Sequence, residues 1–120
     1  MRVYTEAFQY VFDQLGDSGA AVVWDIRDVN PPCVYLVPGR AEYAALAACD
    51  VDVVMYLVAP NAGTAPAIDV LDQLLETVRM WLPVRDVDGA AVATPAGGDP
   101  LRALRTSINV RVKPDQQKGP

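Results

Sequence analysis

Histidine is absent from this sequence of 120 residues, which removes the side chain that most often serves as a general base in enzymes. Only two cysteines are present, Cys33 and Cys49, and without a CxxC pair or a histidine they cannot complete a tetrahedral zinc site. Each borders an apolar run, so we expect free thiols in the core, with a disulfide between neighbouring strands as the minor alternative. We therefore expect a protein that is not an enzyme, with no catalytic residue, no metal and no cofactor.

Long apolar runs are also missing. The longest, Val53 to Pro60, is far shorter than the roughly 20 residues of a membrane-spanning helix. The N-terminal stretch is interrupted by Glu6 and lacks the apolar region of a signal peptide. We expect a soluble chain that is made in the cytoplasm and has no membrane partner.

Basic side chains are in the minority. The 10 Lys and Arg residues stand against 15 Asp and Glu residues, which gives a formal net charge of −5. This balance argues against a duplex-binding surface, because such surfaces neutralise phosphates with clustered Lys and Arg. The apolar fraction of 52% with 21% charged residues is instead typical of a folded domain. We expect one α+β domain over residues 1–113 and a flexible tail over 114–120.

Two stretches have the periodicity of amphipathic helices. The first covers residues 4–15 and should end at Gly16, where a C-terminal glycine is expected. The second should begin with Thr64 as its N-cap, carry Pro66 in its first turn, and stop at Pro83. The apolar stripe of the first helix is Tyr4, Phe8, Val11, Phe12 and Leu15. The side chains expected to point inward from the second are Ile68, Leu71, Leu74, Leu75, Val78 and Leu82.

The remaining apolar stretches predict strands. Residues 51–59 give the clearest one, and because both of its faces are largely apolar we place it in the middle of the sheet. Residues 20–26 and 33–37 flank a proline-stiffened turn and read as a hairpin. Residues 90–94 predict a short strand, and residues 104–112 alternate apolar with polar side chains.

The fold expected from these elements is α/β (α+β), with two helices packed on one sheet of four to five strands. The sheet should be mostly antiparallel or mixed, and the element order is α-β-β-β-α-β-β. Residues 39–48 leave two alternatives open, an extended continuation of the preceding strand or one helical turn. Residues 84–103 are otherwise rich in Gly and Pro and suggest a partner-contacting loop, which we expect to be unprotected from hydrogen exchange in the free subunit.

Side chains that could carry chemistry have plainer explanations. The acidic pairs Asp50/Asp52 and Asp69/Asp72 fit a solvated surface better than an acid–base or metal site. The glycine-bearing segments 61–66 and 93–100 lack the spacing of known phosphate-binding loops. Turn formation explains both segments better.

A series of features in fixed order carries a family resemblance. The features are an N-terminal helix ending in LGDSG, the segment VVWDIRDVNPPCVYLVP, the strand CDVDVVMYLVAP, the helix NAGTAPAIDVLDQLLETV and the late strand TSINVRV. Over residues 3–113 the chain resembles the tail terminator family of long-tailed actinobacteriophages. The resemblance lies in the order of the secondary-structure elements and in their local sequence, and it includes no catalytic motif.

The resemblance implies a structural role in the virion tail or neck, after assembly in the host cytoplasm. Terminators of this kind form a hexameric ring on the head-proximal end of the tail tube. They stop the growth of the tube and meet the head-completion, or stopper, proteins. DNA passes through the lumen of such a ring without specific binding, and the acidic balance of this chain would favour that.

A ring subunit needs two different side surfaces that meet head-to-tail. We predict these contacts on the solvent-facing side of the last strand and in the stretch before it. The predicted interface residues are Arg85, Asp86, Asp88, Arg102, Arg105, Asn109 and Arg111. Two other interpretations remain open, a different head–tail connector or head-completion protein, and a small α+β ligand-binding module.

Overall fold

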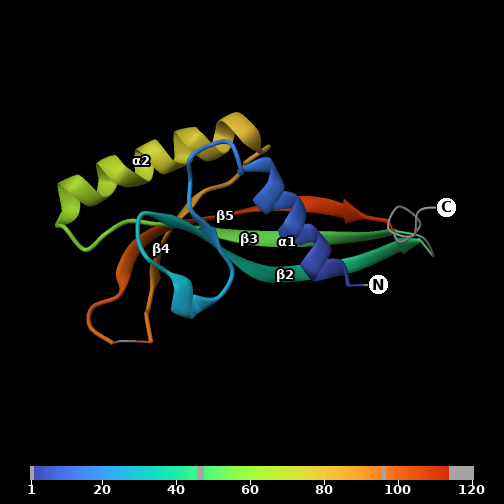
Figure 1. Ribbon diagram of the computed structural model, residues 1–120, viewed down its shortest axis with the longest axis horizontal. Helices are drawn as coiled ribbons and strands as arrows, with labels where there is room; N and C mark the ends of the chain where they lie inside the picture. Colours follow the sequence, from blue (N-terminus) through green and yellow to red (C-terminus); the bar gives the residue numbers. More distant parts are fainter. Residues whose placement is uncertain (1, 46–47, 96, 114–120) are drawn as a thin grey trace.

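The computed structural model describes residues 2–45, 48–95 and 97–113 and confirms the expected α+β fold. Two helices accompany one mixed five-stranded sheet in the order α-β-β-β-α-β-β, with a short 3-10 helix, η1, after the first strand (Figure 1). The elements are α1 (Val3–Gln14), β1 (Val22–Val23), η1 (Ile26–Asp28), β2 (Cys33–Ala45), β3 (Ala48–Val58), α2 (Thr64–Trp81), β4 (Asp88–Val92) and β5 (Leu101–Val112).

The sheet has the strand order β1-β2-β3-β5-β4, so β3 is its central strand, as predicted. Strand β3 pairs antiparallel with both β2 and β5, and β4 pairs antiparallel with β5. Val51, Val53, Met55 and Leu57 on one face of β3 are fully buried, and Val54 and Val58 on the other face are buried too. A strand with two apolar faces is stable only where neighbours cover it on every side.

The predicted hairpin between residues 20 and 37 is wrong. Strand β1 is only two residues long and runs parallel to β2, with Val22 opposite Val34. The reason lies in Asp25, whose side chain accepts a hydrogen bond from the Arg27 N–H at 2.9 Å and caps η1. The chain therefore leaves the sheet after β1 and returns in the same direction.

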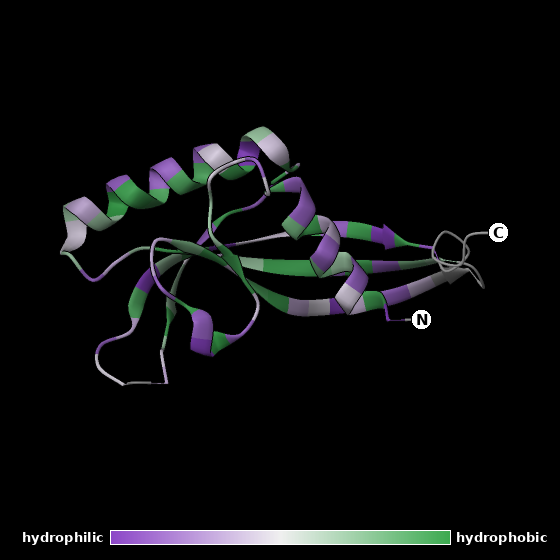
Figure 2. Cartoon of the chain, in the orientation of Figure 1, coloured by the Kyte–Doolittle hydropathy of each residue, from purple (hydrophilic) through white to green (hydrophobic). Residues whose placement is uncertain are grey.

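Both helices cover the same face of the sheet, where they share one core with alternate residues of β2, β3 and β5. In Figure 2 the apolar side of α2 is turned toward the sheet and its polar side away from it. A smaller apolar cluster lies on the opposite face, around Cys33, Val58, Val92 and Ala103. The helix-bearing core contains Val11, Leu15, Leu36, Met55, Leu57, Leu71, Val78 and Ile108, among others.

Helix α1 has the predicted position, but two details differ. Phe8 is buried, whereas Phe12 is 43% exposed because it lies at the rim of the core against Trp24. Gly16 does not take the left-handed conformation. Gly19 takes it instead, at φ 86°. The helix ends at Gln14, and Ser18 closes the turn after it, because both its N–H and its hydroxyl donate to the carbonyl of Leu15.

Helix α2 has the predicted inward face except in its first turn. Thr64 is the first helical residue, not the N-cap, which is Gly63 at φ 93°. Ile68 is 53% exposed, and the small Ala67 is buried in its place. An alanine facing the sheet lets the start of the helix approach closely, which turns the neighbouring isoleucine outward. Leu71, Val78 and Leu82 are buried as expected, and Leu74 and Leu75 are half-buried.

Residues 39–45 and 48 continue in extended conformation, so the strand alternative for 39–48 is correct, and residues 46–47 lie outside the described part. The pairing of β2 with β3 is irregular between Pro38 and Ala41. Gly39 is required there, since an added Cβ would lie 2.7 Å from the backbone oxygen of Asp52. The hydroxyl of Tyr4 donates to the Gly39 carbonyl at 2.7 Å and ties α1 to this point.

The stretch 84–103 is less irregular than expected, because β4 occupies 88–92 and β5 already begins at Leu101. The predicted alternation along β5 is confirmed, with Thr106, Ile108, Val110 and Val112 buried. The expected flexible tail, 114–120, lies outside the described residues. No helix within the described ranges is long and apolar enough to cross a membrane.

Both cysteines are free thiols in the core, as predicted. Cys49 belongs to the core under the helices, whereas Cys33 belongs to the cluster on the opposite face of the sheet. Burial raises the pKa of the Cys33 thiol, which further lowers its reactivity.

The two adjacent apolar turns of α2 give a matched test of this packing. Leu71→Ala should lower the free energy of unfolding by about 2–5 kcal/mol, because it opens a cavity in the core. Ile68→Ala should change it by less than about 0.5 kcal/mol, because Ile68 is mostly in water. Urea denaturation of both variants measures this difference, and equal losses would contradict the burial of Leu71 and the exposure of Ile68.

Candidate functional site

The face of the sheet opposite the helices divides into two halves. The half near β4 is closed by the smaller apolar cluster, to which Ile26 and Val29 of the β1–β2 connection add their side chains. The other half presents polar side chains of β3 and β5, which lie opposite each other in register. This polar half is the solvent-facing side of β5 on which the sequence predicted interface residues.

Two cross-strand pairs tie up polar groups on this half. Arg111 donates two hydrogen bonds to the carboxylate of Asp50, from Nε at 2.8 Å and from Nη2 at 3.0 Å. Asn109 donates to Asp52 at 3.0 Å. The hydrogen bonds from Arg111 lower the pKa of Asp50, and the carboxylate in turn raises the pKa of Arg111. Both carboxylates of the acidic pair Asp50/Asp52 therefore accept hydrogen bonds from side chains of β5.

Three of the predicted interface residues gather around one hollow beside β5. Arg85, Asp86 and Asn109 line this space of about 450 Å³ together with Pro83 and Ser107. The segment is anchored there by the buried hydroxyl of Thr106, which donates to the Asp86 carbonyl at 2.6 Å. Nearby, Asp88 and Arg105 lie opposite each other in the β4–β5 register, although no ion pair joins their described side chains.

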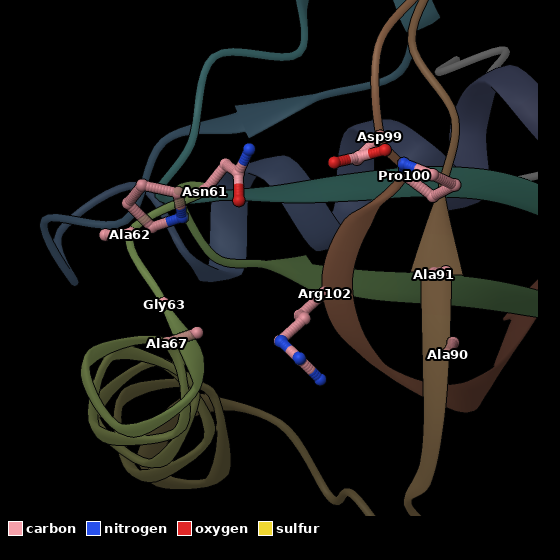
Figure 3. A pocket seen from close by; sticks show the side chains of 10 residues that line it. Asn61, Ala62, Gly63, Ala67, Ala90, Ala91, Asp99, Pro100 and Arg102 are labelled. Atoms are coloured by element: carbon pink, nitrogen blue, oxygen red, sulfur yellow. The ribbon is translucent and has the colours of Figure 1, made fainter.

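Arg102 lies apart from the other predicted residues, in a hollow of about 380 Å³ at the start of α2. Figure 3 shows its side chain between Gly63 at the helix start and Ala90 and Ala91 of β4. Its Nη2 donates to the Thr64 hydroxyl at 3.0 Å. The guanidinium of Arg102 and the first N–H groups of α2 favour a negatively charged group here. The carboxylate of Asp99, which lines the same space, already supplies one.

A third hollow, of about 350 Å³, was not predicted. Phe12, Val22, Val23 and Trp24 supply its apolar walls. Trp24 lies tilted against Phe8 at 5.8 Å and edge-on against Phe12 at 5.9 Å, measured between ring centroids, so the three rings form one cluster. The sequence placed Phe12 in the core and Trp24 within a long strand. The early end of β1 leaves both rings at the surface instead.

The rim of this aromatic hollow is acidic, with Asp25 and Asp28. Asp25 is satisfied by Arg27, whose hydrogen bonds lower the pKa of the Asp25 carboxyl to about 2. Asp28, on η1, accepts no side-chain hydrogen bond and forms no ion pair within the described chain. Asp28 adds a negative charge beside the exposed aromatic rings, close to the cationic side chain of Arg27.

Large apolar side chains are exposed in two groups. Phe12 and Trp24 form the aromatic hollow, and Met80 and Trp81 lie together in the last turn of α2. Met80 is 81% exposed, the largest exposed fraction among the large apolar side chains of the described residues. The full set is Tyr10, Phe12, Trp24, Tyr43, Ile68, Met80 and Trp81.

The described residues contain no group of three or more His, Cys, Asp or Glu side chains that could hold a metal ion. A comparison of the sequence with models of protein families finds no match, and a comparison with curated proteins finds none either. The features that remain are surfaces suited to contact other molecules: the polar half-face, the hollow beside β5, the aromatic hollow and the end of α2.

The Asp50–Arg111 pair predicts a pH-dependent contribution to stability. The pKa of Asp50 is lowered in the folded chain, so the stabilisation is present above the unfolded value of about 3.9 and is lost as the pH falls through the folded value. Arg111→Met should therefore lower stability near neutral pH and change it little at about pH 2. Arg105→Met, on the same face without an ion pair, is the matched control. Denaturant titrations at both pH values test this, and a difference that persists in acid would contradict the role of the charge pair.

Proposed function

We propose that this chain is a structural subunit of a phage tail, namely a tail terminator that assembles into a ring, which the family resemblance implies is hexameric. The ring caps the tail tube and joins it to the head-completion proteins, and DNA passes through its lumen without specific binding. The protein then resides in the neck of the virion after assembly in the host cytoplasm.

The observation that carries this proposal is the exposure of large apolar side chains at two separate places. Exposed apolar patches rimmed by charge mark contact surfaces, since a chain that stays alone gains nothing from leaving such groups in water. The two patches differ in composition, one a hollow of rings and the other the end of a helix. Two unlike surfaces are what a head-to-tail ring requires, whereas a two-fold dimer uses one surface twice.

The polar half-face fits a second part of the role. On this half-face Arg111 neutralises Asp50, and Asn109 holds Asp52 by a hydrogen bond. Such a surface suits contact with a further protein or with water in a lumen better than adhesion to a polyanion. The sequence resemblance over residues 3–113 supplies the partners, the tail tube on one side and the head-completion protein on the other.

Particle mass in solution and negative-stain images of the purified chain, alone and mixed with tail tubes, test the proposal. Six-fold rings, free or on the ends of tubes, are the expected result. Twelve-fold rings would indicate a connector, and a monomer stabilised by a small ligand would indicate a binding module. A chain that neither closes into rings nor binds tubes would contradict the terminator role.

A further inference from the structure

We propose that residues 86–92 form a strap that opens and closes on β5 as a unit of its own, and that the hydroxyl of Thr106 is the latch that holds the strap shut. The strap consists of β4 and the two residues before it. Strands β2, β3 and β5 stay paired while it opens. The device belongs to the single chain, so it holds whether or not the proposed ring forms.

The side chains of the strap contribute little to its position on the sheet. Strand β4 has the sequence DGAAV, and Asp, Gly and, to a lesser degree, Ala are depleted in strands. Asp88, Gly89 and Ala91 are exposed and Ala90 is half-buried, so these four residues bury little apolar surface. A Cβ added at Gly89 would meet nothing within 4 Å, which shows open space beside the strand. The pairing of β4 with β5 therefore depends on what holds its two ends.

The two ends of the strap are held in different ways. At the end of β4, Val92 is 6% exposed and packs in the smaller apolar cluster with Val58 and Ala103. At the other end, the hydroxyl of Thr106 donates to the carbonyl of Asp86 at 2.6 Å. One end is thus held by apolar packing and the other by a hydrogen bond from a single side chain.

Thr106 is suited to act as a latch. Among the described residues it is the one polar side chain that is buried, at 3% exposed. A buried hydroxyl without a partner is unfavourable, so Thr106 favours the closed position of Asp86. Thr106 itself is paired with Met55 of the central strand, so it stays in place when the strap leaves.

The position of β4 in the sheet lets it open alone. It is the last strand in the order β1-β2-β3-β5-β4 and pairs only with β5 (Figure 1). Strand β5 is held on its other side by β3, over residues 103–112. Departure of the strap therefore breaks one strand pairing and leaves the core under the helices intact.

Opening changes the surface that the sheet presents. In the described part of the chain, β4 pairs with β5 over residues 101–105, and no strand pairs with residues 107–112 on that side. When the strap opens, the uncovered edge of β5 extends over the whole strand. An uncovered edge of this kind is where a strand of another chain can add, so the strap controls how much of β5 is accessible.

Hydrogen exchange in the native, isolated chain tests whether the strap moves alone. The amides of β4 that pair with β5 should exchange about a hundredfold faster than those of β3, and with little dependence on urea, because a local opening exposes little surface. Equal protection of β4 and β3 would overturn the proposal, since β4 would then open only when the whole chain unfolds. Amides of β4 without any protection would overturn it too, because the strap would not be closed.

Substitution of the latch tests the role of the hydroxyl. Thr106→Val keeps the shape of the side chain but removes the hydroxyl, so exchange in β4 should become about fivefold faster, which corresponds to one hydrogen bond. Thr106→Ser keeps the hydroxyl and should leave the β4 rates within about twofold of wild type. Ser107→Ala is the matched control, because it removes an exposed hydroxyl at the next position. Unchanged rates in Thr106→Val, or equal increases in Thr106→Val and Thr106→Ser, would overturn the latch.

A reversible lock tests the strap without changing the latch. Ala91 and Arg102 are exposed and lie opposite each other in the β4–β5 register, so Ala91→Cys with Arg102→Cys should form a disulfide across the two strands. Cys33 and Cys49 are buried and should not compete. In the oxidised chain the β4 amides should exchange about as slowly as those of β3, and in the reduced chain about a hundredfold faster. Equal β4 rates in the two forms would overturn the proposal, since β4 would then exchange without leaving β5.

Discussion

The whole fold depends on the burial of β3 on both faces. Its residues alternate between the core under the helices and the surface below, and both sets are apolar except at Asp50 and Asp52. Burying a Val, Leu or Met side chain contributes roughly 1.5–3 kcal/mol each, so this one strand provides a large part of the hydrophobic driving force. β2 and β5 flank it, and α1 and α2 cover it. The candidate contact surfaces lie outside the core that forms around this strand.

Much of this architecture is predictable from the sequence because its periodicity is strong. Strand β3 and the alternation along β5 follow from side-chain type alone, and so do the two helices. The hairpin prediction failed because one local interaction, the capping of η1 by Asp25, ends β1 after two residues. The prediction for Ile68 alone failed on α2, because hydrophobicity favours Ile68 in the core, whereas close approach to the sheet favours the smaller Ala67.

The candidate interface was harder to predict than the fold. The seven predicted residues share a charge or an amide and an exposed position, but they divide among different surroundings. Asn109 and Arg111 have partners on β3, and those partners depend on a register that links residues about 60 positions apart, which no local pattern records. Arg102 lies at the start of α2, and only Arg85, Asp86 and Asn109 meet in one hollow. The aromatic hollow was missed because its rings are exposed only through the early end of β1.

The two thiols on opposite faces of the sheet have a consequence for where the protein can exist. Cys33 and Cys49 are separated by the sheet itself, so oxidation cannot join them without unfolding the chain. No covalent bond between side chains holds the described fold together, and its free energy depends on packing and hydrogen bonds. Such a fold does not depend on a disulfide, so its stabilising contacts are the same in reducing and in oxidising surroundings.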